Sequence, residues 1–141
     1  MAKPAKKKKK PQKSVYPGIT PRLASAGVQA ALKVLEGRWK LTILFELFGE
    51  RTLRFSELER AIPGITQKML IQQLRDLERD GIVARTVTPS VPVRVDYELT
   101  PLGISLSRLL CAVKDWAELH IEEVNEARDR YDAPSAASAA S

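Results

Sequence analysis

Apolar residues recur at helical spacing in segments that glycine and proline separate. The segment from Gly27 to Glu36 has apolar side chains three and four positions apart, which predicts a helix that Gly37 ends. The strongly apolar segment from Trp39 to Phe48 predicts a second helix, closed by Gly49, in the middle of the core.

The next segments predict two helices joined by a tight turn. A short extended piece covers Thr52 to Phe55, and Ser56 is expected to cap a helix that ends at Pro63-Gly64. Thr66 is expected to cap a second helix that runs to about Asp80, where Gly81 breaks it. On that helix the leucines at i, i+4 and i+7 predict one buried stripe: Leu70, Leu74 and Leu77.

The rest of the chain predicts a β-hairpin followed by a long helix. Two β-branched runs, Ile82 to Thr88 and Val93 to Leu99, flank a proline-bounded tip from Pro89 to Pro92. Thr100 is then expected to cap a helix with Pro101 at its first position, and this helix extends to about Tyr131.

This order of elements predicts an α+β fold that is mostly α: a winged helix-turn-helix with a long C-terminal dimerisation helix. The two helices around Pro63-Gly64-Ile65 form the helix-turn-helix, and the hairpin that follows forms the wing. Other small α+β domains share this order, so the pattern alone does not fix the function.

Charge separates the tails from the folded part. Seven of the 23 basic residues are lysines within residues 1–13, so the remaining 16 nearly balance the 17 acidic residues. We expect residues 1–14 to be a disordered lysine-rich tail and residues 132–141 a disordered Ala/Ser-rich tail. We expect residues 15–131 to form the winged domain, including the dimerisation helix at about 101–131.

The helix from Thr66 to Asp80 has the polar side chains that suit the DNA major groove. Glutamine fits adenine edges, whereas lysine and arginine fit guanine or a phosphate. A solvated helix surface looks similar, but here the face has little acid near its N-terminus, a tight turn before it and a hairpin after it. The candidate groups on this helix are Thr66, Gln67, Lys68, Gln72 and Arg75, with Lys40, Arg54 and Arg94 as candidate clamps on the DNA backbone.

The C-terminal helix has more apolar surface than a small winged domain can cover, which favours a dimer interface over packing on its own domain. We expect its second half, beyond Trp116, to be the better part of the interface. The residues expected to contribute are Leu109, Val113, Trp116 and Val124.

Little in the sequence favours catalysis, and we expect no enzyme activity and no cofactor. The single histidine, His120, and the single cysteine, Cys111, are nine positions apart on one helix and face different ways. Cys111 lies among apolar residues and is expected to be buried and structural, while His120 has no neighbours at metal-ligand spacing. Apolar stretches such as Leu41 to Phe48 are too short to span a bilayer, and we expect no secretory signal in the lysine-rich start.

Three stretches resemble the HxlR family of bacterial winged-helix regulators: GRWK followed by LTILFEL, RFSELERAIPGITQKMLIQQLRDLERDGIVAR, and PVRVDYELTPLG. The resemblance covers roughly Val28 to Trp116. It implies a homodimer built from the first and last helices, which adds Val28 and Leu32 to the expected interface. It also implies that the wing around Pro92 and Arg94 lies near the phosphates.

The chain departs from the family in one respect. Several members sense oxidants or electrophiles through a cysteine just before the first helix, but the segment from Val15 to Val28 has none. We therefore do not expect thiol sensing by that route.

The resulting hypothesis is a cytoplasmic, nucleoid-associated bacterial homodimer that binds double-stranded DNA at a pseudo-palindromic operator as a repressor or activator. One alternative is a nonspecific architectural protein that uses the lysine-rich tail. A second is a protein-interaction module that uses the same fold without DNA. A small-molecule effector stays open.

Overall fold

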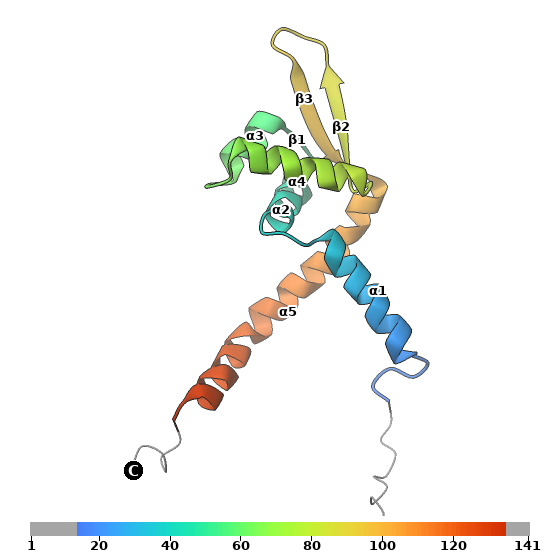
Figure 1. Ribbon diagram of the computed structural model, residues 1–141, viewed down its shortest axis with the longest axis vertical. Helices are drawn as coiled ribbons and strands as arrows, with labels where there is room; N and C mark the ends of the chain where they lie inside the picture. The colour runs from blue at the N-terminus through green and yellow to red at the C-terminus, as the bar shows by residue number, and fades with distance from the viewer. Residues whose placement is uncertain (1–13, 135–141) are drawn as a thin grey trace, which may run out of the picture. The chain divides into compact units, whose positions relative to one another are not determined.

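The computed structural model describes residues 14–134 of the 141 residues, and the chain divides between Glu36 and Gly37 into two compact units (Figure 1). The predicted tails lie almost wholly outside the described residues. The fold is mostly helical with a small antiparallel sheet and a long C-terminal helix, so the predicted winged helix-turn-helix is confirmed.

The first unit contains helix α1 (Pro21–Val34), which begins six residues before the predicted start at Gly27. The local signal is Pro21 at the first helical position, where proline loses no hydrogen bond. No residue of α1 is buried. The helix therefore presents its apolar side chains, Val28 and Leu32 among them, without covering them.

Helix α2 (Lys40–Glu50) opens the second unit and supplies its central core residues, Ile43, Leu44 and Leu47. The prediction that Gly49 closes this helix is wrong, because the helix continues to Glu50. It ends at Arg51, which takes a φ of 62° while its N–H donates to the carbonyl of Leu47 at 2.7 Å.

Strand β1 (Thr52–Arg54) leads directly into helix α3 (Phe55–Ala61). The prediction that Ser56 caps this helix is wrong, because Phe55 is already helical and Arg54 occupies the cap position. The Glu57 carboxylate accepts a hydrogen bond from the Arg54 N–H at 3.0 Å. The carboxylate thus accepts a hydrogen bond from one of the backbone N–H groups that the start of a helix leaves without a partner.

Helix α4 (Gln67–Arg79) begins and ends where its capping residues predict. The Thr66 hydroxyl accepts a hydrogen bond from the Met69 N–H at 3.1 Å. At the other end Gly81 has a φ of +76°, and the N–H of Ile82 reaches the carbonyl of Leu77 at 2.9 Å. This is the glycine-dependent helix ending that satisfies the last carbonyl groups.

The sheet has the order β1-β3-β2, with β2 (Val83–Thr88) and β3 (Arg94–Leu99) forming the predicted hairpin. In the antiparallel register Val83 pairs with Leu99 and Thr88 pairs with Arg94. Only the base of the hairpin is buried, since Val83, Tyr97 and Leu99 are covered while the residues of β2 from Ala84 onward are exposed. The hairpin therefore projects from the domain as a wing (Figure 1).

Helix α5 (Pro101–Asp132) begins at a close contact with the turn between α4 and β2. The Thr100 hydroxyl accepts a hydrogen bond from the Gly103 N–H at 3.1 Å and donates to the carbonyl of Gly81 at 2.6 Å. A Cβ atom added to Gly103 would lie 2.2 Å from the carbonyl oxygen of Ile82. Glycine is required here because α5 approaches the backbone of the preceding turn.

We predict that Gly103→Ala lowers the free energy of unfolding by about 3 kcal/mol or more, because the added methyl group meets backbone that cannot move aside cheaply. The control is Gly27→Ala in α1, where an added Cβ meets nothing within 4 Å and should stabilise the helix by roughly 0.5–1 kcal/mol. Urea unfolding followed by circular dichroism measures both. Equal stability of Gly103→Ala and the wild type would contradict the close approach.

Candidate nucleic-acid interface

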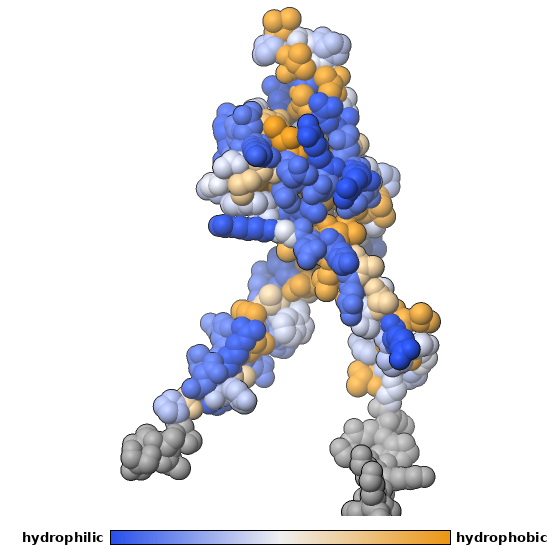
Figure 2. Space-filling view, in the orientation of Figure 1, coloured by the Kyte–Doolittle hydropathy of each residue, from blue (hydrophilic) through white to orange (hydrophobic). Residues whose placement is uncertain are grey.

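The two sides of α4 differ in polarity. Leu70, Leu74 and Leu77 are buried. The opposite side is exposed and has no acidic residue in the first turn, and hydrophilic residues cover this region in Figure 2. All five candidate groups predicted on this helix are exposed: Thr66, Gln67, Lys68, Gln72 and Arg75.

The turn before α4 holds the two helices of the motif together. Ile62 and Ile65 are buried on either side of Pro63 and Gly64, and Gly64 takes a φ of +86°. A Cβ atom at Gly64 would lie 3.8 Å from the Trp39 ring, so the turn passes close to the start of α2. The exposed N-terminal end of α4 is thus positioned by buried neighbours.

Lys40 differs from the other candidates. Only 8% of this residue is exposed, and its ammonium lies 3.6 Å from the carboxylate of Asp76 on α4. A buried, paired ammonium is not available to a phosphate, so the predicted role of Lys40 as a clamp on DNA is wrong. The pair instead links α2 to α4.

Asp76 also contacts Gln72. The Gln72 side-chain amide donates a hydrogen bond to the Asp76 carboxylate at 3.2 Å. Lys40, Asp76 and Gln72 therefore form a short chain of contacts from the core to the exposed side of α4. This chain holds the Gln72 amide in place, and the second N–H of the same amide group can still donate to another partner.

The predicted candidates near the wing lie around one hollow. Arg54 at the end of β1 and Pro92 and Arg94 of the wing line a hollow of about 620 Å³. Arg94 donates from its Nε to both carboxylate oxygens of Asp96, at 3.0 and 3.1 Å, so its charge is partly balanced. Arg54 is exposed and has no carboxylate partner among residues 14–134.

The tip of the wing is held in shape by its own hydrogen bonds. The Ser90 hydroxyl donates to the carbonyl of Pro92 at 2.7 Å. Val91 between them is fully exposed, and hydrophobic side chains gather at this tip in Figure 2. The wing thus combines an apolar tip with an arginine at the start of β3.

The helices expected to form a dimer both have uncovered apolar side chains. On α1, Val28 and Leu32 are each 60% exposed. On α5, Leu109, Val113 and Trp116 are each more than half exposed, while Val124 is partly covered. A shallow hollow on α5 runs along Trp116, His120 and Val124.

Helix α5 contains the single cysteine and the single histidine of the chain, Cys111 and His120. Cys111 is half-buried in the single chain, so its expected full burial is wrong for the chain alone. His120 is partly exposed, with its Nδ1 atom 3.7 Å from the Glu123 carboxylate and its ring 5.3 Å from the Trp116 ring. Nearby, hydrogen bonds and charges from Asp115 and Glu118 raise the pKa of Lys114.

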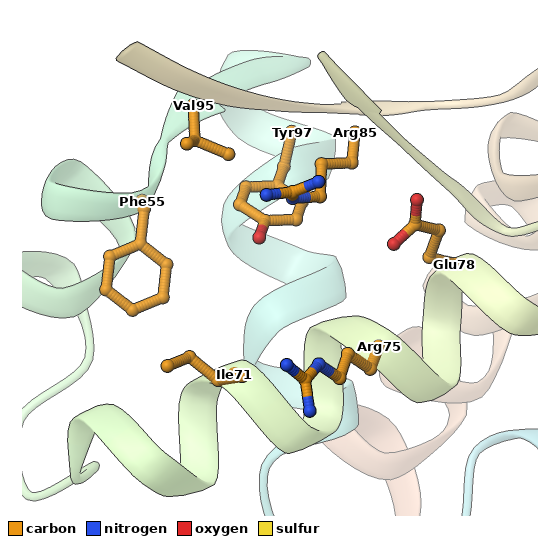
Figure 3. Close-up of a pocket in the computed structure, with 7 residues that line it drawn as sticks. All are labelled: Phe55, Ile71, Arg75, Glu78, Arg85, Val95 and Tyr97. Carbon is orange, nitrogen blue, oxygen red and sulfur yellow. The ribbon is translucent and has the colours of Figure 1, made fainter. Parts of the chain in front are cut away.

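The structure also reveals a hollow that the sequence did not indicate. Arg85 on β2 and Arg75 on α4 line one cavity of about 370 Å³ between the wing and α4, together with Phe55 and Tyr97 (Figure 3). The alternation along β2 places Arg85 on the same face as the buried Val83.

No helix within residues 14–134 has the length and apolar character needed to cross a membrane. Over the same residues, no three histidine, cysteine or carboxylate side chains gather as a metal site would require.

The chain matches known proteins over the part that contains the candidate DNA contacts. Residues 34–125 match the model of the HxlR-like helix-turn-helix family. The helix-turn-helix-type transcriptional regulator YtfH of Escherichia coli K12 is 47% identical over 98 residues, which are 70% of this chain and 77% of YtfH. The regulator YtcD of Bacillus subtilis 168 is also 47% identical, over 69% of this chain and 76% of YtcD.

Solved structures agree with this match. The redox regulator HypR in its reduced form has 38% sequence identity and a TM-score of 0.66, over 71% of this chain and 98% of HypR. The family resemblance in the sequence is thereby confirmed. The chain belongs to the HxlR-like helix-turn-helix family and is a transcriptional regulator of that type with a winged-helix fold.

Proposed function

We propose that this protein binds double-stranded DNA as a homodimer, at a pseudo-palindromic operator, and regulates transcription without catalysing a reaction. The observation that carries the proposal is the exposed polar side of α4, fixed by a buried leucine stripe and free of acid in its first turn. Because the major groove admits one α-helix, this side can reach base edges. The proposed location is the cytoplasm, at the nucleoid.

The proposed contacts are of two kinds: contacts to base edges and contacts to the phosphate backbone. Gln67 and Gln72 offer the paired donor and acceptor that suit adenine, and Lys68 and Arg75 offer donors for guanine or phosphate. Thr66 lies at the helix start, where backbone N–H groups favour a phosphate oxygen. Arg54, Pro92 and Arg94 line the hollow beside the wing, and the two arginines are proposed to hold the DNA backbone.

The proposed dimer covers the apolar side chains that a single chain leaves exposed. Val28 and Leu32 of α1, together with Leu109, Val113, Trp116 and Val124 of α5, form the proposed interface. Two-fold symmetry gives each half of the operator one α4 helix, with half-site centres about 34 Å apart.

The alternatives differ in which part of the chain they use. An architectural protein would bind DNA through the lysine-rich tail. A protein-interaction module would not bind DNA at all, through either α4 or the tail. The polar side of α4 favours specific binding over both, because exposed glutamines beside lysine and arginine can read base edges and neither alternative requires them.

We predict that selection from a random duplex pool at ~150 mM salt, where nonspecific phosphate binding is weakened, recovers a two-fold symmetric motif. Lys68→Ala combined with Gln72→Ala should abolish that motif, because each base contact contributes roughly 1–3 kcal/mol of discrimination. Arg79→Ala, an exposed arginine at the end of α4, is the matched control and should retain it.

The same selection separates the alternatives. Removing residues 1–13 should leave the motif unchanged and only weaken binding overall. If no motif emerges and binding disappears with the tail, the architectural alternative replaces the regulator. If the wild type binds no DNA under these conditions, the interaction-module alternative replaces it.

We predict that Val113→Asp converts the protein to monomers at micromolar concentration, because a carboxylate would be buried without a partner in the dimer. At roughly 100° per residue, Asn125 lies about 120° around α5 from Val113 and about 180° from Trp116, away from the proposed interface, so Asn125→Asp is the matched control. Sedimentation velocity measures the mass of each. A Val113→Asp protein that sediments as a dimer would rule out this part of α5 as the interface.

A further inference from the structure

The cavity between α4 and the wing has the size of a small-ligand site. Its volume of about 370 Å³ lies near the lower end of the range typical for pockets that bind small molecules. It lies where α4 and the hairpin diverge, at the edge of the buried core, and Phe55 at the start of α3 closes one side (Figure 3).

One part of the lining is apolar and partly aromatic. Val95 and Tyr97 are two apart on β3 and therefore share a face of the sheet, and Tyr97 is 6% exposed. Phe55 and Ile71, both half-buried, complete this part from α3 and α4. These side chains offer a rigid surface to a flat apolar group.

The other part of the lining is charged. Arg85 is the cross-strand partner of Tyr97, so the two side chains project from the same face of the hairpin. Arg75 faces the same cavity from α4 (Figure 3). Within residues 14–134 neither guanidinium forms an ion pair, so both are available to an anion.

The balance of these charges indicates the charge of the ligand. Glu78 also lines the cavity, so two guanidinium groups and one carboxylate leave a net formal charge of +1. A monoanion neutralises that charge, and the planar guanidinium group suits a carboxylate because it can donate two parallel hydrogen bonds.

We propose that this cavity binds a small aromatic monocarboxylate, with the carboxylate between Arg75 and Arg85 and the ring against Phe55 and Tyr97. Bound there, the ligand occupies Arg75 and the space between α4 and the wing. It therefore weakens DNA binding, and DNA weakens ligand binding by the same factor. This regulatory consequence rests on the proposed DNA-binding function, whereas the binding of the carboxylate does not.

Calorimetric titration of the full chain with benzoate tests the site directly. We expect one benzoate per chain, bound more tightly than benzamide, which lacks the charge, and than acetate, which lacks the ring. Arg85→Gln should weaken benzoate binding roughly tenfold or more, because a charge-assisted hydrogen bond is lost. Arg79→Gln changes an arginine of α4 outside the cavity and should leave binding unchanged.

Three results would overturn the site. Benzoate that binds no better than benzamide or acetate, or equally well to Arg85→Gln, means that the cavity does not recognise an aromatic carboxylate. Inorganic phosphate that binds more tightly than benzoate means that the two arginines serve the DNA backbone instead. Thermal unfolding shows whether each variant folds, and Val95→Phe, which fills the cavity while keeping both arginines, should also reduce benzoate binding.

The regulatory consequence is tested on a duplex recovered by the selection described above. Benzoate at saturation should weaken the binding of the wild type to that duplex and should not affect Arg85→Gln, which still binds DNA. If benzoate binds but DNA affinity does not change, the site stands and its regulatory role is wrong. If the protein binds no duplex, the proposed function fails, while the calorimetric result for the cavity is unaffected.

Discussion

The packing of α4 against the core determines which of its side chains any partner can reach. A helix has only one stripe to bury, and here Leu70, Leu74 and Leu77 occupy it beside the core residues of α2. Every polar candidate for reading DNA then faces outward as a consequence. The buried Lys40 ammonium of α2 adds a second constraint on the position of α4, because it pairs with the Asp76 carboxylate on α4. Specificity for DNA would thus depend on residues that never touch it.

A second close contact links the base of the wing to the start of α5. Thr100 caps α5 and also binds the carbonyl group at the end of α4, while Gly103 lets α5 approach the first residues of the wing. The base of the hairpin, the end of α4 and the start of α5 therefore meet at one point. A ligand in the cavity beside Tyr97 would act close to this junction. Such a ligand could change the separation of α4 and the wing without disturbing the core.

Local sequence signals were sufficient to predict those helix ends that a single residue determines. Thr66, Gly81 and Thr100 each occupy the position that their side chain or backbone preference predicts. The prediction failed at two other helix ends, where a different local residue sets the boundary. Helix α2 continues through Gly49 and ends at Arg51, and the N-cap N–H of α3 is bound by Glu57, whereas Ser56 was expected to cap the helix. Likewise the sequence shows that Lys40 is cationic, but not that it is buried beside Asp76. The cavity with Arg75 and Arg85 depends on strand register and helix position, which no short-range pattern contains.

The most direct test of a symmetric dimer that reads the major groove is where its two α4 helices contact one duplex. Hydroxyl-radical footprinting on a selected duplex measures which nucleotides the protein protects. The expected result is two protected regions on one face of the DNA, related by two-fold symmetry, with half-site centres about one helical turn (~34 Å) apart. Protection of a single half-site, or a continuous protected tract that does not depend on sequence, would contradict it.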